Sequence, residues 1–150
     1  MRNRSLIKIP NILLVDDDPL NVQALARTLG GAGFATTRAL DGVEALECLE
    51  TETFDAVVSD VLMPRMNGLQ LVRRIRRRFP DLPVILMSGL ISDEVCDAIA
   101  GLGAAALFQK PVSRAALILL LRSLPREPGR PCCEFYWSES EPEEAYSLSA

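Results

Sequence analysis

Short apolar runs alternate with amphipathic segments between residues 12 and 124, and this alternation limits the fold more than any other feature. Runs such as residues 84–87 contain no polar side chain, which is typical of strands buried on both faces. Between the runs, apolar residues recur at spacings of three and four, as at Val22, Leu25 and Leu29, which predicts helices with one buried face. The pattern predicts an α/β fold, a doubly wound parallel sheet of five strands with five helices on its two faces. We expect strands at residues 12–15, 34–39, 56–59, 84–87 and 105–108, and helices that begin near residues 19, 42, 68, 93 and 113. The N-caps of the first, second and fourth of these helices are expected to be Asp18, Asp41 and Ser92.

The composition is that of a globular protein with a single core. Of the 150 residues, 49% are apolar and 24% are charged, and a chain of this length can bury a full core without disulfides or a structural metal. The longest wholly apolar run, residues 115–121, is too short to span a bilayer, and residues 1–10 contain no apolar signal-peptide core. We therefore expect a cytoplasmic protein without a membrane segment.

The net charge of −4 is concentrated near the C-terminus. From residue 125 onward there are six Glu and two Arg, whereas residues 1–124 hold 14 acids and 14 bases. We expect a domain at residues 10–124, and a Pro- and Glu-rich extension at residues 125–150 that is mobile or docked on a partner. Its aromatic run, residues 135–137, is either docked on its own domain or a neighbour, or exposed as a ligand motif. The balanced charge of the domain predicts no direct DNA binding.

The histidine, arginine and cysteine content of the chain limits the kinds of catalytic and metal site that it can form. The chain has no histidine, which excludes Ser-His and Cys-His nucleophile pairs and removes the usual partners of zinc. Five arginines between residues 73 and 78 lie opposite the apolar stripe of their helix, and we interpret them as a solvated face, with phosphate or partner contact as the alternative. The cysteines follow no metal-ligand spacing and are interpreted as inert thiols: Cys48, Cys96, Cys132 and Cys133.

The polar residues that interrupt the apolar pattern fall at the ends of predicted strands. Asp16 and Asp17 follow the first strand, Asp60 the third, Ser88 the fourth and Lys110 the fifth. The carboxyl ends of parallel strands share one edge of the sheet, so these five residues are expected to converge on one crevice.

This set of side chains suits phosphoryl chemistry. Three carboxylates placed together repel one another unless a cation neutralises them, and an all-oxygen site suits Mg²⁺, with Mn²⁺ as a substitute. A carboxylate such as Asp60 can attack phosphorus to form an aspartyl phosphate. Lys110, one of only two lysines among 16 basic residues, would supply fixed positive charge, and Ser88 a hydroxyl donor.

With these motifs in order, residues 10–124 resemble the receiver domain of two-component response regulators. The family's acid pair matches Asp16 and Asp17, its phosphorylated aspartate matches Asp60 in the run Ser-Asp-Val-Leu-Met-Pro, and its Ser or Thr after the fourth strand matches Ser88. The family's Lys-Pro step matches Lys110 and the proline that follows it.

The resemblance implies further expectations. It implies a flavodoxin-like sheet of strand order 2-1-3-4-5, a backbone carbonyl of Leu62 as an additional Mg²⁺ ligand, and a cis peptide bond between Lys110 and Pro111. It implies a signalling phosphoacceptor rather than an enzyme, with only self-directed phosphotransfer and autodephosphorylation. The phosphodonor would be a histidine kinase or a histidine phosphotransfer protein, and the output would pass to a downstream protein target or through a phosphorylation-dependent homodimer.

One position departs from the family pattern. Many receivers have an aromatic switch residue three positions before the lysine, and here that position is Leu107, whereas the neighbouring Phe108 should point to the other side of its strand. Leu107 is the one feature that favours an alternative function, a pseudo-receiver that binds partners independently of phosphate.

A second alternative is a haloacid-dehalogenase-like phosphatase, which also forms an aspartyl phosphate. Its Asp-x-Asp motif would correspond to Asp16 and Asp18. However, Leu20 replaces the Thr of that motif, and Pro19 assigns Asp18 to the N-cap of a helix.

Overall fold

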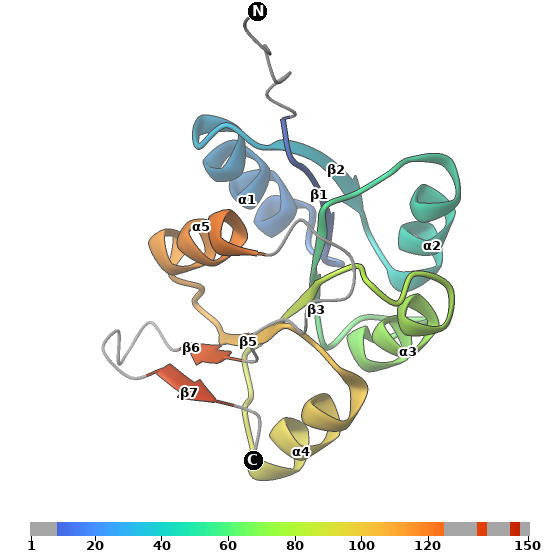
Figure 1. The fold of residues 1–150 in the computed structure, drawn as a ribbon, viewed down its shortest axis with the longest axis vertical. Coiled ribbons are helices and arrows are strands. Elements are labelled where there is room, and N and C mark those ends of the chain that lie inside the picture. The colour runs from blue at the N-terminus through green and yellow to red at the C-terminus, as the bar shows by residue number, and fades with distance from the viewer. Residues whose placement is uncertain (1–8, 125–134, 138–144, 148–150) are drawn as a thin grey trace, which may run out of the picture.

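The computed structural model describes residues 9–124, 135–137 and 145–147. Its central feature is a parallel sheet whose first five strands have the order β2-β1-β3-β4-β5, as expected for a flavodoxin-like α/β fold (Figure 1). The strands are β1 Asn11–Val15, β2 Ala35–Ala39, β3 Ala56–Asp60, β4 Val84–Ser88 and β5 Ala106–Gln109. The helices that connect them are α1 Pro19–Gly31, α2 Gly42–Thr51, α3 Gly68–Arg78, α4 Asp93–Leu102 and α5 Arg114–Ser123.

The interior of the sheet is buried on both faces because alternate side chains of β1, β3, β4 and β5 enter different layers of the core, whereas the edge strand β2 is largely exposed. Leu13, Val57 and Leu86 pack in the layer beneath α2, α3 and α4. Leu14 and Ile85 pack in the layer beneath α1 and α5, which lie together on the other face (Figure 1). The continuously apolar runs in the sequence are explained by this two-sided burial.

Polar caps set where the helices begin. The predicted N-caps Asp18, Asp41 and Ser92 are confirmed, since each side chain accepts a hydrogen bond from a backbone amide in the first turn of its helix. Asn67 caps α3 and exchanges two hydrogen bonds with Gln70, a capping box. A cap of this kind stabilises its helix by about 1 kcal/mol.

Two strands extend the sheet beyond the five that the sequence predicts. β6, Phe135–Trp137, pairs in parallel with β5, and β7, Ala145–Ser147, pairs antiparallel to β6. The aromatic run is therefore paired with its own domain, one of the arrangements weighed from the sequence. Strands of three residues carry too little periodicity to be recognised in a Pro- and Glu-rich segment. The rest of the extension, including Cys132 and Cys133, lies outside the described residues.

Arg76 corrects the expectation that all five arginines of α3 form a solvated face. Its guanidinium is half-buried and donates hydrogen bonds to the backbone carbonyl oxygens of Gly103 (3.1 Å) and Pro80 (3.2 Å). Arg76 thus ties α3 to the loops before β4 and after α4. None of the helices in the described residues is long and apolar enough to cross a membrane.

Candidate functional site

The site is built around Asp60, the last residue of β3. All five residues of β3 are buried, because this strand lies between β1 and β4 in the middle of the sheet. The Asp60 side chain is 9% exposed, and its Oδ1 accepts a hydrogen bond from the amide of Leu62 (3.3 Å). Asp60 is therefore held at the carboxyl edge of the sheet with little contact to solvent.

Asp16 and Asp17 come to the same place from the end of β1. Asp16 is buried, its amide donates to the carbonyl of Ala39 (3.2 Å), and its Oδ1 accepts from the amide of Asp18 (3.0 Å). Asp17 is exposed. One carboxylate oxygen from each of Asp16, Asp17 and Asp60 lies within 4.8 Å of the other two.

Lys110 brings the balancing charge from the end of β5. Its Nζ lies 2.8 Å from Oδ2 of Asp60 and 3.4 Å from Oδ2 of Asp16, and its amide donates to the carbonyl of Ser88 (2.8 Å). Burial alone would lower the pKa of Lys110, but the hydrogen bond and negative charge of Asp60, together with Asp16, raise it above its usual value. The lysine therefore remains an ammonium ion. The predicted cis bond between Lys110 and Pro111 is confirmed.

The donor set fits a divalent cation. Three carboxylates around one ammonium group leave excess negative charge, and burial together with the hydrogen bond and charge of Asp16 raises the pKa of Asp17. A bound cation would relieve this repulsion. Carboxylate oxygens, a backbone carbonyl and water are the ligands that Mg²⁺ prefers, so Asp16, Asp17, Asp60 and the carbonyl of Leu62 are the candidates to hold it.

Ser88 lies at the same edge but its hydroxyl does not face the carboxylates. The Ser88 Oγ donates to the carbonyl of Leu90 (2.8 Å) and accepts from the amide of the same residue (3.2 Å). The structure thus brings Asp16, Asp17, Asp60 and Lys110 together, and leaves the Ser88 hydroxyl engaged with the loop after β4.

Leu107 is fully buried on the α4 side of the sheet and does not line the site. Phe108 is also fully buried and packs in the opposite layer, beneath α5, as its alternation in the strand predicts. No aromatic side chain from β5 therefore lies on the face where the family's switch residue would be.

Sequence reasoning missed the contacts that hold the loop between β3 and α3. Arg65, which has a left-handed backbone (φ 64°), forms an ion pair with Asp41, the N-cap of α2. A Cβ on Gly42 would lie 2.8 Å from the Met66 side chain, and a Cβ on Gly68 would lie 2.4 Å from the carbonyl oxygen of Asp60. In the sequence, the Asn-Gly pair at residues 67 and 68 could have indicated the close contact between Gly68 and the carbonyl of Asp60.

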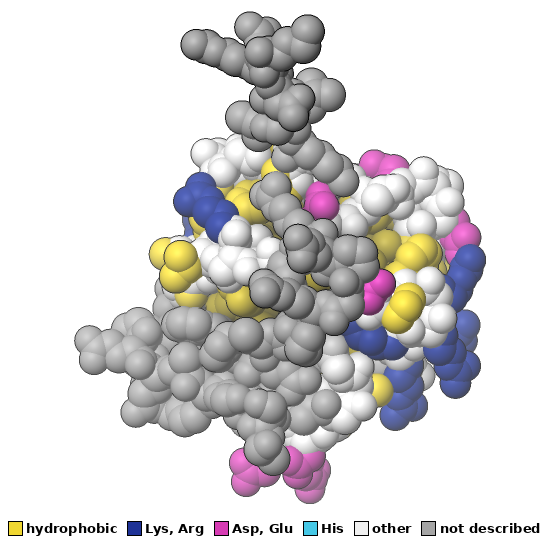
Figure 2. Space-filling view, viewed as in Figure 1, with side chains coloured by type: hydrophobic (Ala, Val, Ile, Leu, Met, Phe, Trp, Pro, Cys, Tyr) yellow, Lys and Arg dark blue, Asp and Glu magenta, His cyan; other side chains and the backbone are white. Residues whose placement is uncertain are grey.

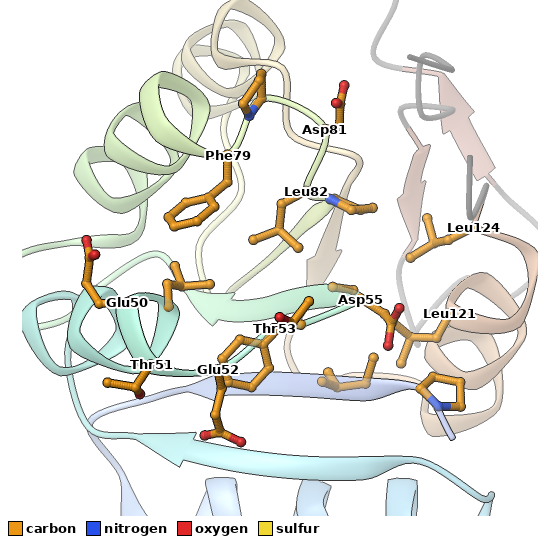
Figure 3. A pocket seen from close by; sticks show the side chains of 17 residues that line it. Glu50, Thr51, Glu52, Thr53, Asp55, Phe79, Asp81, Leu82, Leu121 and Leu124 are labelled. Atoms are coloured by element: carbon orange, nitrogen blue, oxygen red, sulfur yellow. The ribbon is translucent and has the colours of Figure 1, made fainter. Parts of the chain in front are cut away.

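A cavity of about 510 Å³ lies away from this site (Figure 3). It opens at the amino ends of the strands, between Ile12 of β1, Ala56 of β3 and Pro83 before β4. Phosphoryl chemistry at Asp60 cannot use it, because Asp60 is at the opposite edge of the sheet.

Comparison with known proteins agrees with this geometry. The family model of the response regulator receiver domain matches residues 12–122. The chain belongs to the response regulator receiver family. It carries its carboxylates at one edge of the five parallel strands β2-β1-β3-β4-β5, and it is a signalling domain of two-component systems.

Curated relatives support the assignment of the receiver. The chain is 39% identical over 117 residues to the response regulator MprA of Mycobacterium ulcerans, and 38% identical over 117 residues to that of Mycobacterium avium. Each alignment covers 77% of this chain and 50% of the relative, so the chain spans about half the length of the curated relatives it matches.

Solved structures support the receiver fold. The Vibrio cholerae chemotaxis protein CheY4 superposes with a TM-score of 0.75 at 29% identity, covering 79% of this chain and 100% of that one. A response regulator receiver protein from Pseudomonas putida superposes with a TM-score of 0.75 at 28% identity, covering 78% and 98% of the two chains.

Proposed function

We propose that this receiver accepts a phosphoryl group on Asp60 from the phosphohistidine of a histidine kinase or a histidine phosphotransfer protein. The observation that carries the proposal is the position of Asp60, whose carboxylate lies beside two further carboxylates and 2.8 Å from the Lys110 ammonium. Phosphoryl transfer demands little covalent chemistry from the protein, and is accelerated mainly by positioning and fixed positive charge.

In the transfer step, a carboxylate oxygen of Asp60 forms a bond to phosphorus while the phosphorus–nitrogen bond of the donor breaks. The departing imidazole nitrogen keeps the bonding electron pair. Lys110 exchanges its hydrogen bond with Asp60 for one with a phosphoryl oxygen, where its charge stabilises the negative charge of the transferring group. Mg²⁺, or Mn²⁺ in its place, would add positive charge at the same oxygens. Asp16, Asp17, Asp60 and the Leu62 carbonyl would hold this ion.

The Ser88 hydroxyl would act after transfer. It is bonded to Leu90, and rotation about its Cα–Cβ bond would replace these contacts with a hydrogen bond to a phosphoryl oxygen. The loop after β4 would lose two hydrogen bonds in this exchange. Because this loop leads into α4, phosphorylation of Asp60 would thereby change the conformation at the start of α4. The return reaction is attack of water on phosphorus, which releases phosphate and restores the Asp60 carboxylate. Self-directed transfer and autodephosphorylation are the only catalysis we assign.

The output is proposed to be a change in protein binding at the surface formed by α4, β5 and α5, either to a downstream protein or to a second copy of the receiver. In this chain β6 is paired along β5, so a partner at that edge would contact or displace β6. We assign no direct DNA contact to the receiver, because residues 1–124 carry as many acids as bases.

The test is intact-mass analysis after incubation with acetyl phosphate, with and without Mg²⁺. The wild type should gain one phosphoryl mass only with Mg²⁺, and Asp60→Ala should gain none. A phosphatase using Asp16 would instead label Asp60→Ala and fail with Asp16→Ala. If neither acetyl phosphate nor a beryllofluoride mimic modifies or binds the wild type, the chain is a phosphate-independent pseudo-receiver and the proposal is wrong.

A further inference from the structure

A groove of about 420 Å³ lies along the outer surface of α3, away from the carboxylate site. Figure 2 shows Lys and Arg side chains gathered on the side of the molecule where Figure 1 places α3. We call this surface the arginine groove, and it is lined by Arg65, Met66, Gln70, Arg73, Arg74, Arg77 and Arg78.

The charges of the arginine groove are only partly neutralised. Arg65 pairs with Asp41, and Arg78 pairs with Glu50 of α2. Arg73, Arg74 and Arg77 are exposed, and none of the three makes a hydrogen bond or ion pair with another described residue. Within the described residues, the α3 wall of the groove therefore carries three positive charges that no acid neutralises.

Helix stability alone does not explain this arrangement. Arginines in the last turn of a helix are favoured by the helix dipole, which accounts for Arg77 and Arg78. Arg73 and Arg74 lie in the middle of α3, and each is four residues before another arginine, a spacing at which like charges destabilise a helix. Arg65 is outside the helix and still lines the groove. Bringing these charges together costs free energy that an anionic ligand would recover.

We propose that the arginine groove binds a short acidic segment of a partner protein. Guanidinium groups bind carboxylates through two parallel hydrogen bonds. Three guanidinium groups on one helix that have no acidic partner among the described residues match an extended segment with several Asp or Glu side chains. Arg65 and Arg78 are already held by their acidic partners, so both ends of the groove are ordered before binding. Gln70 is exposed and offers its side-chain amide to the backbone of the segment, whereas Met66 is largely buried and forms only the floor of the groove.

Neighbouring charges favour a polypeptide over a nucleic acid. Glu47 and Glu50 are exposed on α2, and Glu50 reaches α3 through its ion pair with Arg78. A duplex or a long single strand would extend over these acids and over a domain with balanced charge. A narrow acidic segment would contact only the arginines.

Binding in this groove does not depend on phosphoryl chemistry at Asp60. Arg65 and Met66 belong to the loop that follows Asp60, so an occupant would lie next to the phosphoacceptor loop without contacting its carboxylates. The two proposals can fail separately, because the groove can be tested in Asp60→Ala.

The test measures fluorescence anisotropy of a labelled peptide of six Glu separated by Gly, at low and at physiological salt, against the full chain. The double variant Arg73→Glu/Arg77→Glu removes two attractive charges and places two repulsive ones against the peptide, so it should bind at least fivefold more weakly than the wild type. The matched control Arg27→Glu/Arg38→Glu changes the net charge equally on exposed arginines of α1 and β2, and should bind within about twofold of the wild type. Asp60→Ala should bind like the wild type.

Four results would overturn the proposal. If both double variants weaken peptide binding equally, binding depends only on the net charge of the protein. If a peptide with Gln in place of Glu binds as tightly, the groove does not recognise carboxylates. Tighter binding of a labelled single-stranded oligonucleotide than of the peptide, lost in Arg73→Glu/Arg77→Glu, would assign the groove to nucleic acid. Sedimentation that reveals a homo-oligomer dissolved by Arg73→Glu/Arg77→Glu would make the groove an interface between copies. Circular dichroism confirms that each variant is folded.

Discussion

The Nζ atom of Lys110 lies 2.8 Å from Oδ2 of Asp60, although the two residues are 50 positions apart in the chain. The contact exists because β3 and β5 end at the same edge of a parallel sheet, with β4 between them. It gives the negative cluster of carboxylates its one resident cation among the described residues.

Lys110→Ala should slow the gain of phosphoryl mass from acetyl phosphate by at least about tenfold, because removing one preorganised donor to a developing charge commonly costs more than this. The rate is followed by mass spectrometry at saturating Mg²⁺. Lys110→Arg keeps the charge but not the compact ammonium, and should recover only part of the rate. An unchanged rate in Lys110→Ala would remove Lys110 from the mechanism.

Asp17→Asn should reduce the gain in free energy of unfolding that Mg²⁺ gives to the protein. Without metal, the variant loses one member of a repelling carboxylate cluster, so its free energy of unfolding in EDTA should rise by up to about 1 kcal/mol. With Mg²⁺, the wild type should gain stability from bound metal and the variant should gain much less. Chemical denaturation under both conditions measures this, and an equal gain from Mg²⁺ in the two proteins would contradict the assignment of Asp17 as a ligand.

Asp41 should contribute stability that disappears in acid. Its pKa is lowered by the hydrogen bond from the amide of Glu44 and by the charge of Arg65. A carboxylate with a lowered pKa stabilises the folded state above its unfolded pKa of about 3.9, and this stability is lost as the pH falls through the lower folded value. Asp41→Ala removes both the cap and the carboxylate, and should therefore lose about 1–2 kcal/mol at pH 7 and show a shallower decline of stability below about pH 4.

Arg65→Gln separates the two functions of Asp41. It removes the ion pair and leaves the cap on α2 intact, so it should cost less than about 1 kcal/mol at pH 7, because the Arg65 side chain is 65% exposed. A loss as large as that of Asp41→Ala would show that the ion pair, and not the cap, carries the effect. Urea unfolding between pH 3 and pH 7 measures both variants.

Gly68→Ala should disturb Asp60 directly. The new Cβ would lie 2.4 Å from the carbonyl oxygen of Asp60, and backbone cannot move aside as a flexible side chain can. We expect a loss of about 2–4 kcal/mol in the free energy of unfolding, together with slower phosphorylation. The control is Gly101→Ala, in an exposed turn of α4 with open space around the new Cβ, which should stabilise the protein by about 0.5–1 kcal/mol.

The five central strands and the site carboxylates could be predicted because their signals are local. Two-sided burial makes β1, β3, β4 and β5 short apolar runs, and the polar residue that ends each run is visible in the sequence, whereas the edge strand β2 is polar and largely exposed. Asp18 and Ser92 were likewise identified as caps because capping depends on a backbone amide two or three residues away. The convergence of Asp16, Asp60 and Lys110 then follows from the geometry of parallel strands.

The features that were missed depend on contacts distant in sequence. The ion pair between Asp41 and Arg65 joins two loops, and the positive φ of Arg65 has no signature in a non-glycine residue. Arg76 was assigned to solvent from its place on the helix, but its long side chain reaches carbonyl groups on two loops. The rotamer of Ser88 could not be predicted from the sequence either, because a hydroxyl at a strand end can face either the site or its own loop.

The pairing of β6 with β5 has a practical consequence for anyone who wishes to study the receiver alone. In the described residues the sheet ends at β2 and β7, and β5 is an interior strand. A chain cut after residue 124 leaves β5 as a bare edge whose amide and carbonyl groups can recruit a strand from another molecule. The choice of C-terminal boundary therefore determines whether a recombinant sample of the receiver exposes a strand edge through which its molecules can associate.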